Sequence, residues 1–288
     1  IGLIITLFFG YTGMGAKRWI RVGGFNLQIS EFAKIALVLF MAKYFHKLNA
    51  EKTIGLFRSI VPLVISLLVF LLVAIQPDLG TAIIILTLGL IAIFYAGINL
   101  IYPLLSLIVL GLASPFLWTL LKPYQQNRVK IFLNPDLDPL GKGYHIIQSK
   151  IAIGSGGMRG NGFLGGSQSS LDFLPEKETD FVFAIFSEQF GFTGSMIILG
   201  LFLLFFLIPI LKSFSLTQVF NKLILFVLSF KIFFEFLINI SMTIGLVPVV
   251  GVALPFMSYG GSSLLSNMII CALLMNFMSI SEKKRMFS

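Results

Sequence analysis

The chemistry open to this chain depends on a few carboxylates and lysines that interrupt apolar stretches. Asp180 closes the acidic segment Glu176–Asp180 and directly precedes a long apolar run, with Glu188 about two turns further along. A carboxylate in that place can cap the following helix, because a helix N-terminus stabilises negative charge. It can equally accept a proton from a bound hydroxyl as a general base. The spacing alone leaves both interpretations open.

Two lysine–glutamate pairs lie inside otherwise apolar segments. Glu31 and Lys34 are three residues apart in the sequence. Lys231 and Glu235 are four apart, so in both cases the two side chains project from one face of a helix. Ionisable groups inside a membrane are costly, which makes each pair a candidate functional site. Each pair can also be purely structural, neutralising its own charges and holding helices together. For Lys231 and Glu235 the structural and the functional interpretation are equally supported. For Glu31 and Lys34 the neighbouring basic segment favours a functional site.

Cations and hydrogen-bond donors gather in two polar segments. Gly15–Arg21 carries three positive charges. Lys122–Asp180 carries seven basic and six acidic residues and is longer than most connections in compact proteins, which favours a functional loop over simple solvation. Within it, Tyr124–Arg128 and Tyr144–Lys150 supply donors that suit an anionic, hydroxyl-rich ligand. Gly154–Gly162 can bind an anion through its backbone N–H groups, but glycine content alone favours a flexible hinge.

The elements that must hold these residues are membrane-spanning helices. Of the 288 residues, 57% are hydrophobic and only 11% are charged, and the mean hydropathy is +0.97. A soluble domain carries roughly 25% charged residues, so this composition excludes a soluble enzyme. Since one crossing needs about 20 apolar residues, we predict an all-α, polytopic helical membrane protein with about seven full spans, one partial span and a long extracytoplasmic loop.

The apolar stretches place these spans. Ile1–Phe9 is too short to cross a membrane and is the predicted partial span. The full spans fall in Ile29–Tyr44, Ile60–Ile75, Leu79–Leu121, Phe181–Leu211 and Leu223–Ile280. The third and fifth of these are twice the length of one crossing, so we expect turns near residues 97–99 and within residues 247–261. Residues 1–288 are predicted to form one transmembrane domain, with residues 122–180 as the large loop within it.

Basic residues set the predicted orientation. Two short connections and the C-terminal tail fall on the same side of the membrane when the crossings are counted, and by the positive-inside rule that side is the cytoplasm. The residues concerned are Lys43, Lys47, Lys52, Arg58, Lys212, Lys222, Lys283, Lys284 and Arg285. The polar segments 15–21 and 122–180 then face outward. Because the chain starts inside an apolar run without Met, we expect it to lack its true start.

Several classes of site are excluded by residue content. The single Cys271 cannot form a disulfide within the chain, and with two histidines there is no ligand cluster for a metal. No phosphate-binding loop of the GxxxxGK[ST] type occurs. The formal charge of +9 therefore indicates phosphate-bearing membrane partners, and not nucleic acid.

Taken together, the motifs resemble the shape, elongation, division and sporulation (SEDS) family of bacterial cell-wall synthases. The resemblance covers almost the whole chain and is carried by Gly15–Arg21, Ser30–Lys34, Gln76–Thr81, Asn134–Gly157, Phe173–Glu188, Asn239–Pro255 and Ser258–Ser263. Asp138–Gly157 is similar to the rod-shape branch of that family. The chain departs from the family pattern at Glu178, where His is common, and at Ser241, where Gly is usual. SEDS proteins have about ten membrane helices, so this chain is expected to lack the first two and part of the third.

The resemblance implies a peptidoglycan glycosyltransferase of the bacterial cytoplasmic membrane, which polymerises lipid II during cell elongation and releases undecaprenyl pyrophosphate. Asp180 matches the family's essential aspartate and is the implied general base. The implied substrate-binding residues are Lys34, Glu31, Arg18, Trp19, Arg128, Gln148 and Lys150.

The same resemblance implies a class B penicillin-binding transpeptidase as partner, with lipid II, membrane lipids and other proteins of the elongation complex. A divalent cation, Mg²⁺ or Mn²⁺, could assist at the pyrophosphate, but the sequence offers no ligand set for one. Two alternatives stay open: a lipid II flippase, and a non-catalytic membrane scaffold. A transporter places its essential charges near the bilayer midplane, as Lys231 and Glu235 would be. A polymerase gathers them at the outer boundary, where Asp180, Glu31 and Lys34 are expected.

Overall fold

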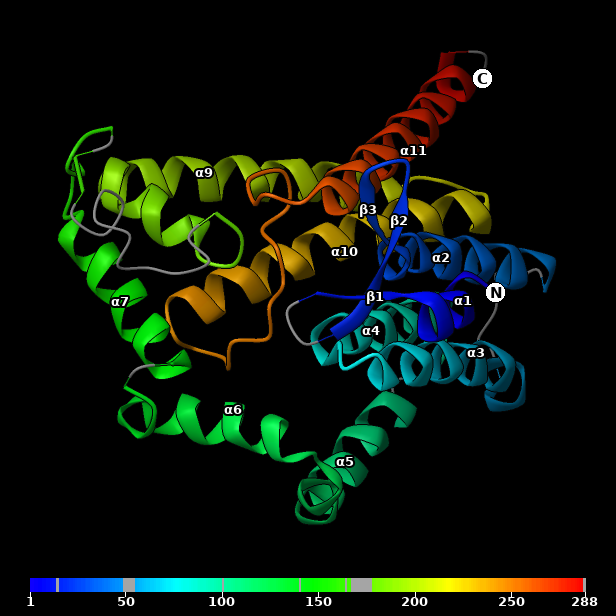
Figure 1. Ribbon diagram of the computed structural model, residues 1–288. Helices are drawn as coiled ribbons and strands as arrows, with labels where there is room; N and C mark the ends of the chain where they lie inside the picture. The colour runs from blue at the N-terminus through cyan, green and yellow to red at the C-terminus, as the bar shows by residue number, and fades with distance from the viewer. Residues whose placement is uncertain are drawn as a thin grey trace. The chain divides into compact units, whose positions relative to one another are not determined.

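The computed structural model of the chain (Figure 1) describes residues 1–13, 16–48, 55–99, 101–139, 141–163, 165–166 and 178–286. The predicted Lys52, Gly15 and Phe173–Lys177 lie outside these residues. The described part is predominantly helical, which confirms the predicted fold class. Its helices are α1 (Gly2–Phe9), α2 (Ile29–Lys47), α3 (Leu56–Ile75), α4 (Leu79–Tyr95), α5 (Ile101–Leu120), α6 (Pro123–Leu133), α7 (Lys142–Ser155), α9 (Val182–Phe214), α10 (Val219–Thr243) and α11 (Gly261–Met286), with a 3-10 turn at Pro135–Leu137.

Both double-length apolar segments break where they were predicted to turn. Between α4 and α5 the chain turns at residues 96–99, where Gly97 adopts a positive φ of 102°. Between α10 and α11 residues 244–260 are not helical but form turns and irregular segments, and they include Pro248 and Pro255. Proline removes a backbone donor, and its ring clashes with the preceding turn of a helix, so the second of these segments does not continue as one helix.

Four helices of the described residues are long and apolar enough to cross a membrane. They comprise Phe57–Ile75, Val182–Phe214, Val219–Thr243 and Gly261–Ser279. The apolar helix α4 is shorter, at 17 residues, and α2 carries Glu31 and Lys34 within its length. The predicted total of about seven spans stays a prediction.

A small sheet accompanies the helices and was not predicted. Strand β2 (Ala16–Val22) pairs antiparallel with β1 (Tyr11–Gly13) on one side and with β3 (Phe25–Gln28) on the other. Gly23 and Gly24 connect β2 to β3 with φ of 55° and 88°. A two-residue hairpin of this kind needs positive φ at both positions, which glycine adopts without steric cost. The basic segment that includes Arg18 and Arg21 is therefore a strand and not an irregular loop.

The chain divides into two compact units. The first unit comprises residues 1–105, 205–234 and 260–288, and the second comprises residues 106–204 and 235–259. In the first unit α4 packs against α2 and α3. Gly89 of α4 faces Ser66 of α3 so closely that a Cβ would collide with its side chain. Small residues allow this close approach, which increases van der Waals contact between helices.

In the second unit, helix α7 packs against the start of α9. Ala152, Phe181 and Ala184 are buried together, with Ile153, Ile185 and Val249 partly buried around them. The ring of His145 stacks on Phe181 with centroids 6.1 Å apart. Phe181, the residue directly after Asp180, is therefore part of the core of this unit.

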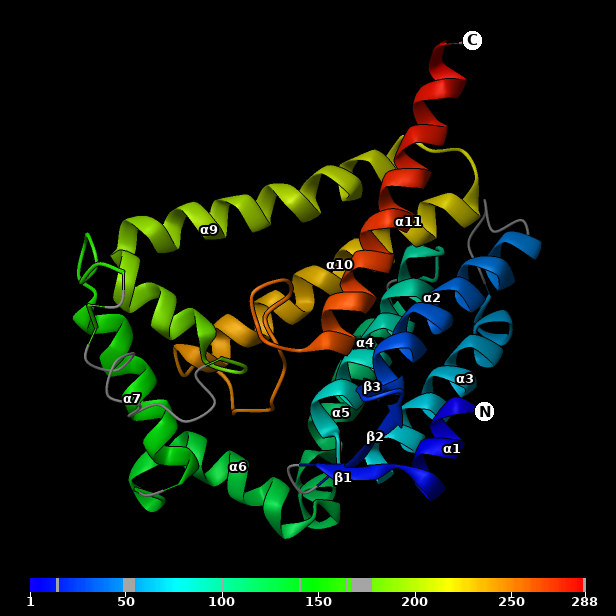
Figure 2. The same cartoon turned by 45° about the horizontal axis from the view of Figure 1, so that its top comes forward.

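Helix α9 is not the straight span that the apolar run Phe181–Leu211 predicted. It bends at Gly191, whose φ of 64° and ψ of −165° are not helical, and Figure 2 shows the bend between its two parts. The bend breaks the helical hydrogen-bond ladder, and the segment 157–162 pairs with the released backbone groups. The bonds run from Asn161 N to Glu188 O (3.0 Å), Gly162 N to Gln189 O (3.1 Å), Phe192 N to Gly157 O (2.8 Å) and Thr193 N to Met158 O (3.1 Å). We call these paired segments, 157–162 and 188–193, the backbone clamp.

Candidate active site

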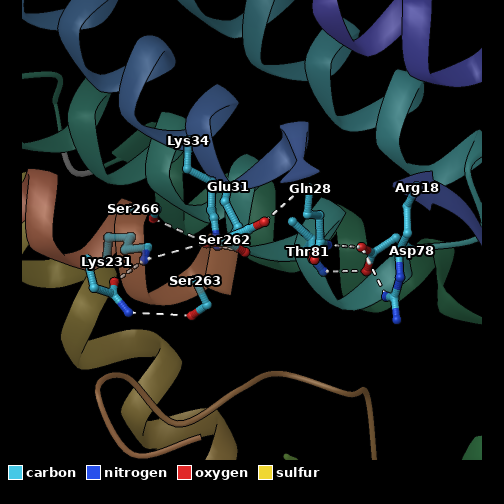
Figure 3. A network of polar contacts seen from close by, with 11 residues as sticks. Arg18, Gln28, Glu31, Lys34, Asp78, Thr81, Lys231, Ser262, Ser263 and Ser266 are labelled. Carbon is cyan, nitrogen blue, oxygen red and sulfur yellow. Dashed lines mark hydrogen bonds and ion pairs between the residues drawn. The ribbon is translucent and has the colours of Figure 1, made fainter. Parts of the chain in front are cut away.

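A buried polar network in the first unit contains the predicted pair Glu31 and Lys34 (Figure 3). Lys34 Nζ donates to Glu31 Oε1 at 2.8 Å. Lys34 is 2% exposed and Glu31 is 8% exposed, so both charged groups are almost removed from solvent. A buried carboxylate needs a close cation and hydrogen bonds to remain charged, and this pair supplies the first of them.

Lys231 of α10 approaches the same carboxylate from another helix. Its Nζ lies 3.9 Å from Glu31 Oε2, and Ser266 of α11 donates to that oxygen at 3.3 Å. Lys231 Nζ also donates to Asn267 Oδ1 at 2.7 Å. Spacing along α10 pointed to Glu235 as the partner of Lys231, and it gave no sign of this contact with α2.

The network continues from the sheet to the start of α4. Asp78 Oδ1 accepts from the backbone N–H of Thr81, at the N-terminus of α4, at 3.2 Å. Its Oδ2 accepts from Gln28 Nε2 at 3.0 Å and lies 3.3 Å from Arg18 Nη1. Asp78 is 3% exposed. Asp78 was not singled out as a functional residue, although it lies in the motif Gln76–Thr81 that carries the family resemblance.

Arg18 is thus positioned by an ion pair, and Trp19 follows it on strand β2. The Arg18 guanidinium carbon is 5.9 Å from the centroid of the Trp19 ring. The backbone N–H of Gln28, on β3, donates to Ser262 Oγ at 2.9 Å, and Ser262 donates to Asn26 O at 2.9 Å. The hairpin is therefore attached to the start of α11. The first unit brings together four of the predicted site residues: Arg18, Trp19, Glu31 and Lys34.

Asp180 lies in the second unit, two residues before the first residue of α9. Asn239 Nδ2 donates to the Asp180 carbonyl at 3.0 Å. The neighbouring Thr179 carbonyl accepts from Ser258 Oγ at 2.5 Å, and the Glu178 carbonyl accepts from the backbone N–H of Tyr259 at 2.8 Å. Three successive carbonyls are thus held by side-chain or backbone donors, while the Asp180 side chain is partly exposed. This arrangement fixes the backbone and leaves the residue accessible.

The non-helical segment 244–252 runs beside Asp180 and Lys150. A Cβ on Gly251 would lie 3.4 Å from Asp180 Oδ2, so the carboxylate is next to the backbone at Gly251. A Cβ on Gly245 would collide with the Lys150 side chain, which therefore lies against the other end of the segment. Both glycines have positive φ, 75° at Gly245 and 74° at Gly251. A side chain at either position would be strained, and at Gly245 it would also collide with Lys150.

The remaining predicted site residues, Arg128 and Gln148, also lie in this unit. Arg128 of α6 lines a small cavity together with Ile131, Ile146 and Val249. Gln148 lies on α7, one residue before Ser149, whose Oγ donates to Thr243 O at 2.6 Å and so attaches α7 to the end of α10. The second unit therefore holds Asp180, Lys150, Gln148 and Arg128.

The glycine-rich segment is packed and hydrogen-bonded. The N–H groups of Gly160, Asn161 and Gly162 donate to backbone carbonyls, at 2.7, 3.0 and 3.1 Å. The Asn161 and Gly162 donors are occupied by the backbone clamp and the Gly160 donor by a local turn to Gly156 O, which argues against the anion-binding interpretation. Among the described residues, no group of three or more His, Cys, Asp or Glu side chains could hold a metal ion.

Comparisons with known proteins match nearly the whole chain to one family. The family model of the FtsW, RodA and SpoVE cell cycle proteins matches residues 1–284. The peptidoglycan glycosyltransferase MrdB of Escherichia coli strain K12 is 40% identical over 281 residues, which are 97% of this chain and 75% of that protein. The peptidoglycan glycosyltransferase RodA of Treponema pallidum is 37% identical over 346 residues, covering 95% of this chain and 79% of that protein.

Two solved structures are similar to this fold. A chain from a study of a peptidoglycan synthase complex that coordinates polymerization and crosslinking has a TM-score of 0.81 and 32% identity, and the match covers 97% of this chain and 78% of that one. The rod shape determining protein RodA of Thermus thermophilus has a TM-score of 0.65 and 25% identity, with 94% and 73% covered.

Proposed function

The chain belongs to the FtsW, RodA and SpoVE family of cell cycle proteins, and from this premise we propose that it polymerises lipid II at the outer face of the bacterial cytoplasmic membrane. It is a membrane-embedded peptidoglycan glycosyltransferase. The observation that carries the proposed site is the anchoring of Asp180, whose backbone is fixed by Asn239 while its side chain stays partly exposed.

Asp180 is the proposed general base. A sugar hydroxyl of the acceptor attacks the anomeric carbon of the donor, a new C–O bond forms, and the bond from that carbon to the lipid pyrophosphate breaks. The hydroxyl proton goes to the Asp180 carboxylate, and undecaprenyl pyrophosphate leaves. A base contributes to such a step only when it is held within hydrogen-bond distance of the proton. The donors to the carbonyls of Glu178, Thr179 and Asp180 support this role, because they restrict the backbone that carries the carboxylate.

Cations are needed where the pyrophosphate leaves, because negative charge develops there in the transition state. Lys34, Arg18, Arg128 and Lys150 are the proposed cations, and Glu31 orients Lys34 through their 2.8 Å contact. Trp19 stacks on a sugar or lies in the interfacial aromatic belt, and Gln148 supplies hydrogen bonds to the substrate. Ser266 supports Glu31, so the pair is embedded and not a freely moving surface ion pair.

A transpeptidase partner completes the proposed function. A polymerase of glycan strands needs a second activity to cross-link the peptides, and we assign that activity to a class B penicillin-binding protein. The similarity to a chain of a synthase complex that coordinates polymerization and crosslinking supports this assignment.

Polymerisation of purified lipid II by the purified protein, with any partner that co-purifies, tests the function. We expect glycan strands that a muramidase digests, with release of undecaprenyl pyrophosphate. A flippase would instead move lipid II across the bilayer of a proteoliposome without forming strands, and a scaffold would do neither. Either of these two outcomes would contradict the proposal.

A further inference from the structure

Lys231 is a buried cation to which the proposed chemistry gives no role. Its side chain is fully buried, with 0% exposure. An ammonium group in the interior is strongly destabilising unless anions or hydrogen-bond acceptors surround it. Two acceptors lie on other helices: Asn267 of α11 at 2.7 Å and Glu31 of α2 at 3.9 Å. Lys231 therefore links α10 to both of them.

The two oxygens of Glu31 have separate partners. Oε1 accepts from Lys34 at 2.8 Å, whereas Oε2 accepts from Ser266 at 3.3 Å and faces Lys231 at 3.9 Å. Because both oxygens have contacts, the rotation of the carboxylate is fixed. The position at which Oε1 accepts the hydrogen bond from Lys34 is then fixed as well. Figure 3 shows Lys231 of α10 and Ser266 of α11 together on one side of Glu31, whereas Lys34 lies on the same helix as Glu31, α2.

A second lysine on one carboxylate also changes the electrostatics. Glu31 carries one negative charge, which Lys34 and Lys231 share. The positive charge of Lys231 offsets part of the negative potential that Glu31 produces around Lys34, and in a poorly solvated interior this effect is larger than in water. Lys34 then keeps more of its attraction for an external anion such as a pyrophosphate.

We propose that Lys231 is a positioning residue for the Glu31–Lys34 pair: it fixes the carboxylate of Glu31 and thereby holds the Lys34 ammonium ready for the leaving pyrophosphate. This proposal rests on the proposed function, because only that function gives Lys34 an anionic substrate. It differs from a simple helix-holding role, since Lys231 acts here through Glu31. The effect of Lys231 should therefore depend on Glu31 being a carboxylate.

Lys231→Met tests the proposal, because Met keeps the volume and removes the charge. We expect kcat/KM for lipid II polymerisation, per folded protein, to fall by about 10- to 100-fold, the usual cost of a misplaced active-site group. Lys222→Met is the matched control, since Lys222 lies on the same helix nine residues before Lys231, and it should retain the parental rate. Lys231→Met at the parental rate would overturn the proposal.

A double-mutant cycle separates positioning from stability. If Lys231 acts through Glu31, Glu31→Gln with Lys231→Met should be no slower than Glu31→Gln alone, because coupled residues are not additive. Two losses that multiply would overturn the proposal, and this comparison decides the matter if Lys231→Met alone does not fold. The parental protein and Asp180→Asn are assayed in parallel. An inactive parental protein defeats the proposed function itself, whereas an unaffected Lys231→Met beside an inactive Asp180→Asn defeats only the role of Lys231.

Discussion

Asn239 and Asp180 are joined by a hydrogen bond that spans 59 positions of the sequence: the side-chain Nδ2 of Asn239 donates to the Asp180 carbonyl at 3.0 Å. The same amide donates to the Val252 carbonyl at 2.8 Å, and Asn239 itself is fully buried, with 0% exposure. One side chain of α10 thus anchors the residue that carries the candidate base and also the segment that runs beside its carboxylate. The position of Asp180 therefore depends on Asn239 as well as on the start of α9.

Replacing Asn239 by Ala should leave two buried carbonyls without this donor. We expect a loss of about 1–3 kcal/mol in the free energy of unfolding and a decrease in lipid II polymerisation per folded protein, because Asp180 loses its anchor. Thermal unfolding in detergent and the polymerisation assay measure the two effects. Asn221→Ala is the control, since Asn221 lies on the same helix and its Nδ2 donates to Gln218 Oε1, three residues away. Equal activity in the two variants would contradict the anchoring role.

The backbone clamp predicts different costs for two neighbouring glycines. Gly160 and Gly162 both have positive φ, 78° and 87°, so Ala is strained at either position. A Cβ on Gly160 would also collide with the backbone of α9 at Gln189, whereas a Cβ on Gly162 meets nothing within 4 Å.

We therefore expect Gly160→Ala to be less stable than Gly162→Ala by about 1–3 kcal/mol, the usual range for an overpacked site. Thermal unfolding of both variants in the same detergent measures the difference, and the shared backbone strain cancels. Matching unfolding temperatures would show that segment 157–162 does not press against α9 at Gly160 in the working protein.

The sequence predicted best what depends on neighbours along the chain. The turns near Gly97 and within residues 247–261 were predicted because proline, glycine and span length act locally. Glu31 and Lys34 were predicted to pair because three residues bring side chains onto one helix face. Strand β2 was missed although Gly23 and Gly24 mark a hairpin turn, because the three charges of Lys17, Arg18 and Arg21 are typical of a polar connection between spans.

Contacts between helices could not be predicted in this way. The helices of a membrane protein are apolar on most faces, so periodicity does not indicate which face meets which partner. The sequence spacing predicted Glu235, on the same helix, as the partner of Lys231. The contact of Lys231 with Glu31, on another helix, is seen only in the structure. The bend at Gly191 was missed although residues 187–195 are rich in polar side chains and glycine, because the run Phe181–Leu211 carries only one charge, Glu188, and was read as a single span.

Exchanging the charges of Glu31 and Lys34 should destabilise the protein, because Lys231 lies beside position 31. Glu31→Lys with Lys34→Glu keeps a carboxylate and an ammonium three residues apart, and from spacing alone it should fold. In the structure a lysine at position 31 would face Lys231, because Glu31 Oε2 is 3.9 Å from Lys231 Nζ. We expect a loss of roughly 3–5 kcal/mol in stability, as for other broken buried ion pairs.

Adding Lys231→Met to the reversed variant should restore part of that stability, because it removes the repulsion between like charges. Unfolding temperatures of the double and the triple variant measure the effect. A reversed double variant that is as stable and active as the parental protein would show that the pair is purely structural and that Lys231 does not act on it.

Asp180→Asn distinguishes the two roles that a carboxylate before α9 can have. Asn caps a helix about as well as Asp, so a capping role predicts nearly normal activity. A proton-accepting role predicts a loss of about 10²–10⁴ in kcat, because an amide does not take the hydroxyl proton. The contacts from Asn239 and Ser258 go to the backbone carbonyls of Asp180 and Thr179, so the substitution leaves these groups in place and the backbone anchored. Thermal unfolding should therefore stay within about 1 kcal/mol of the parental protein. A well-folded Asp180→Asn that polymerises lipid II at the parental rate would remove Asp180 from the chemistry and leave it as a helix cap.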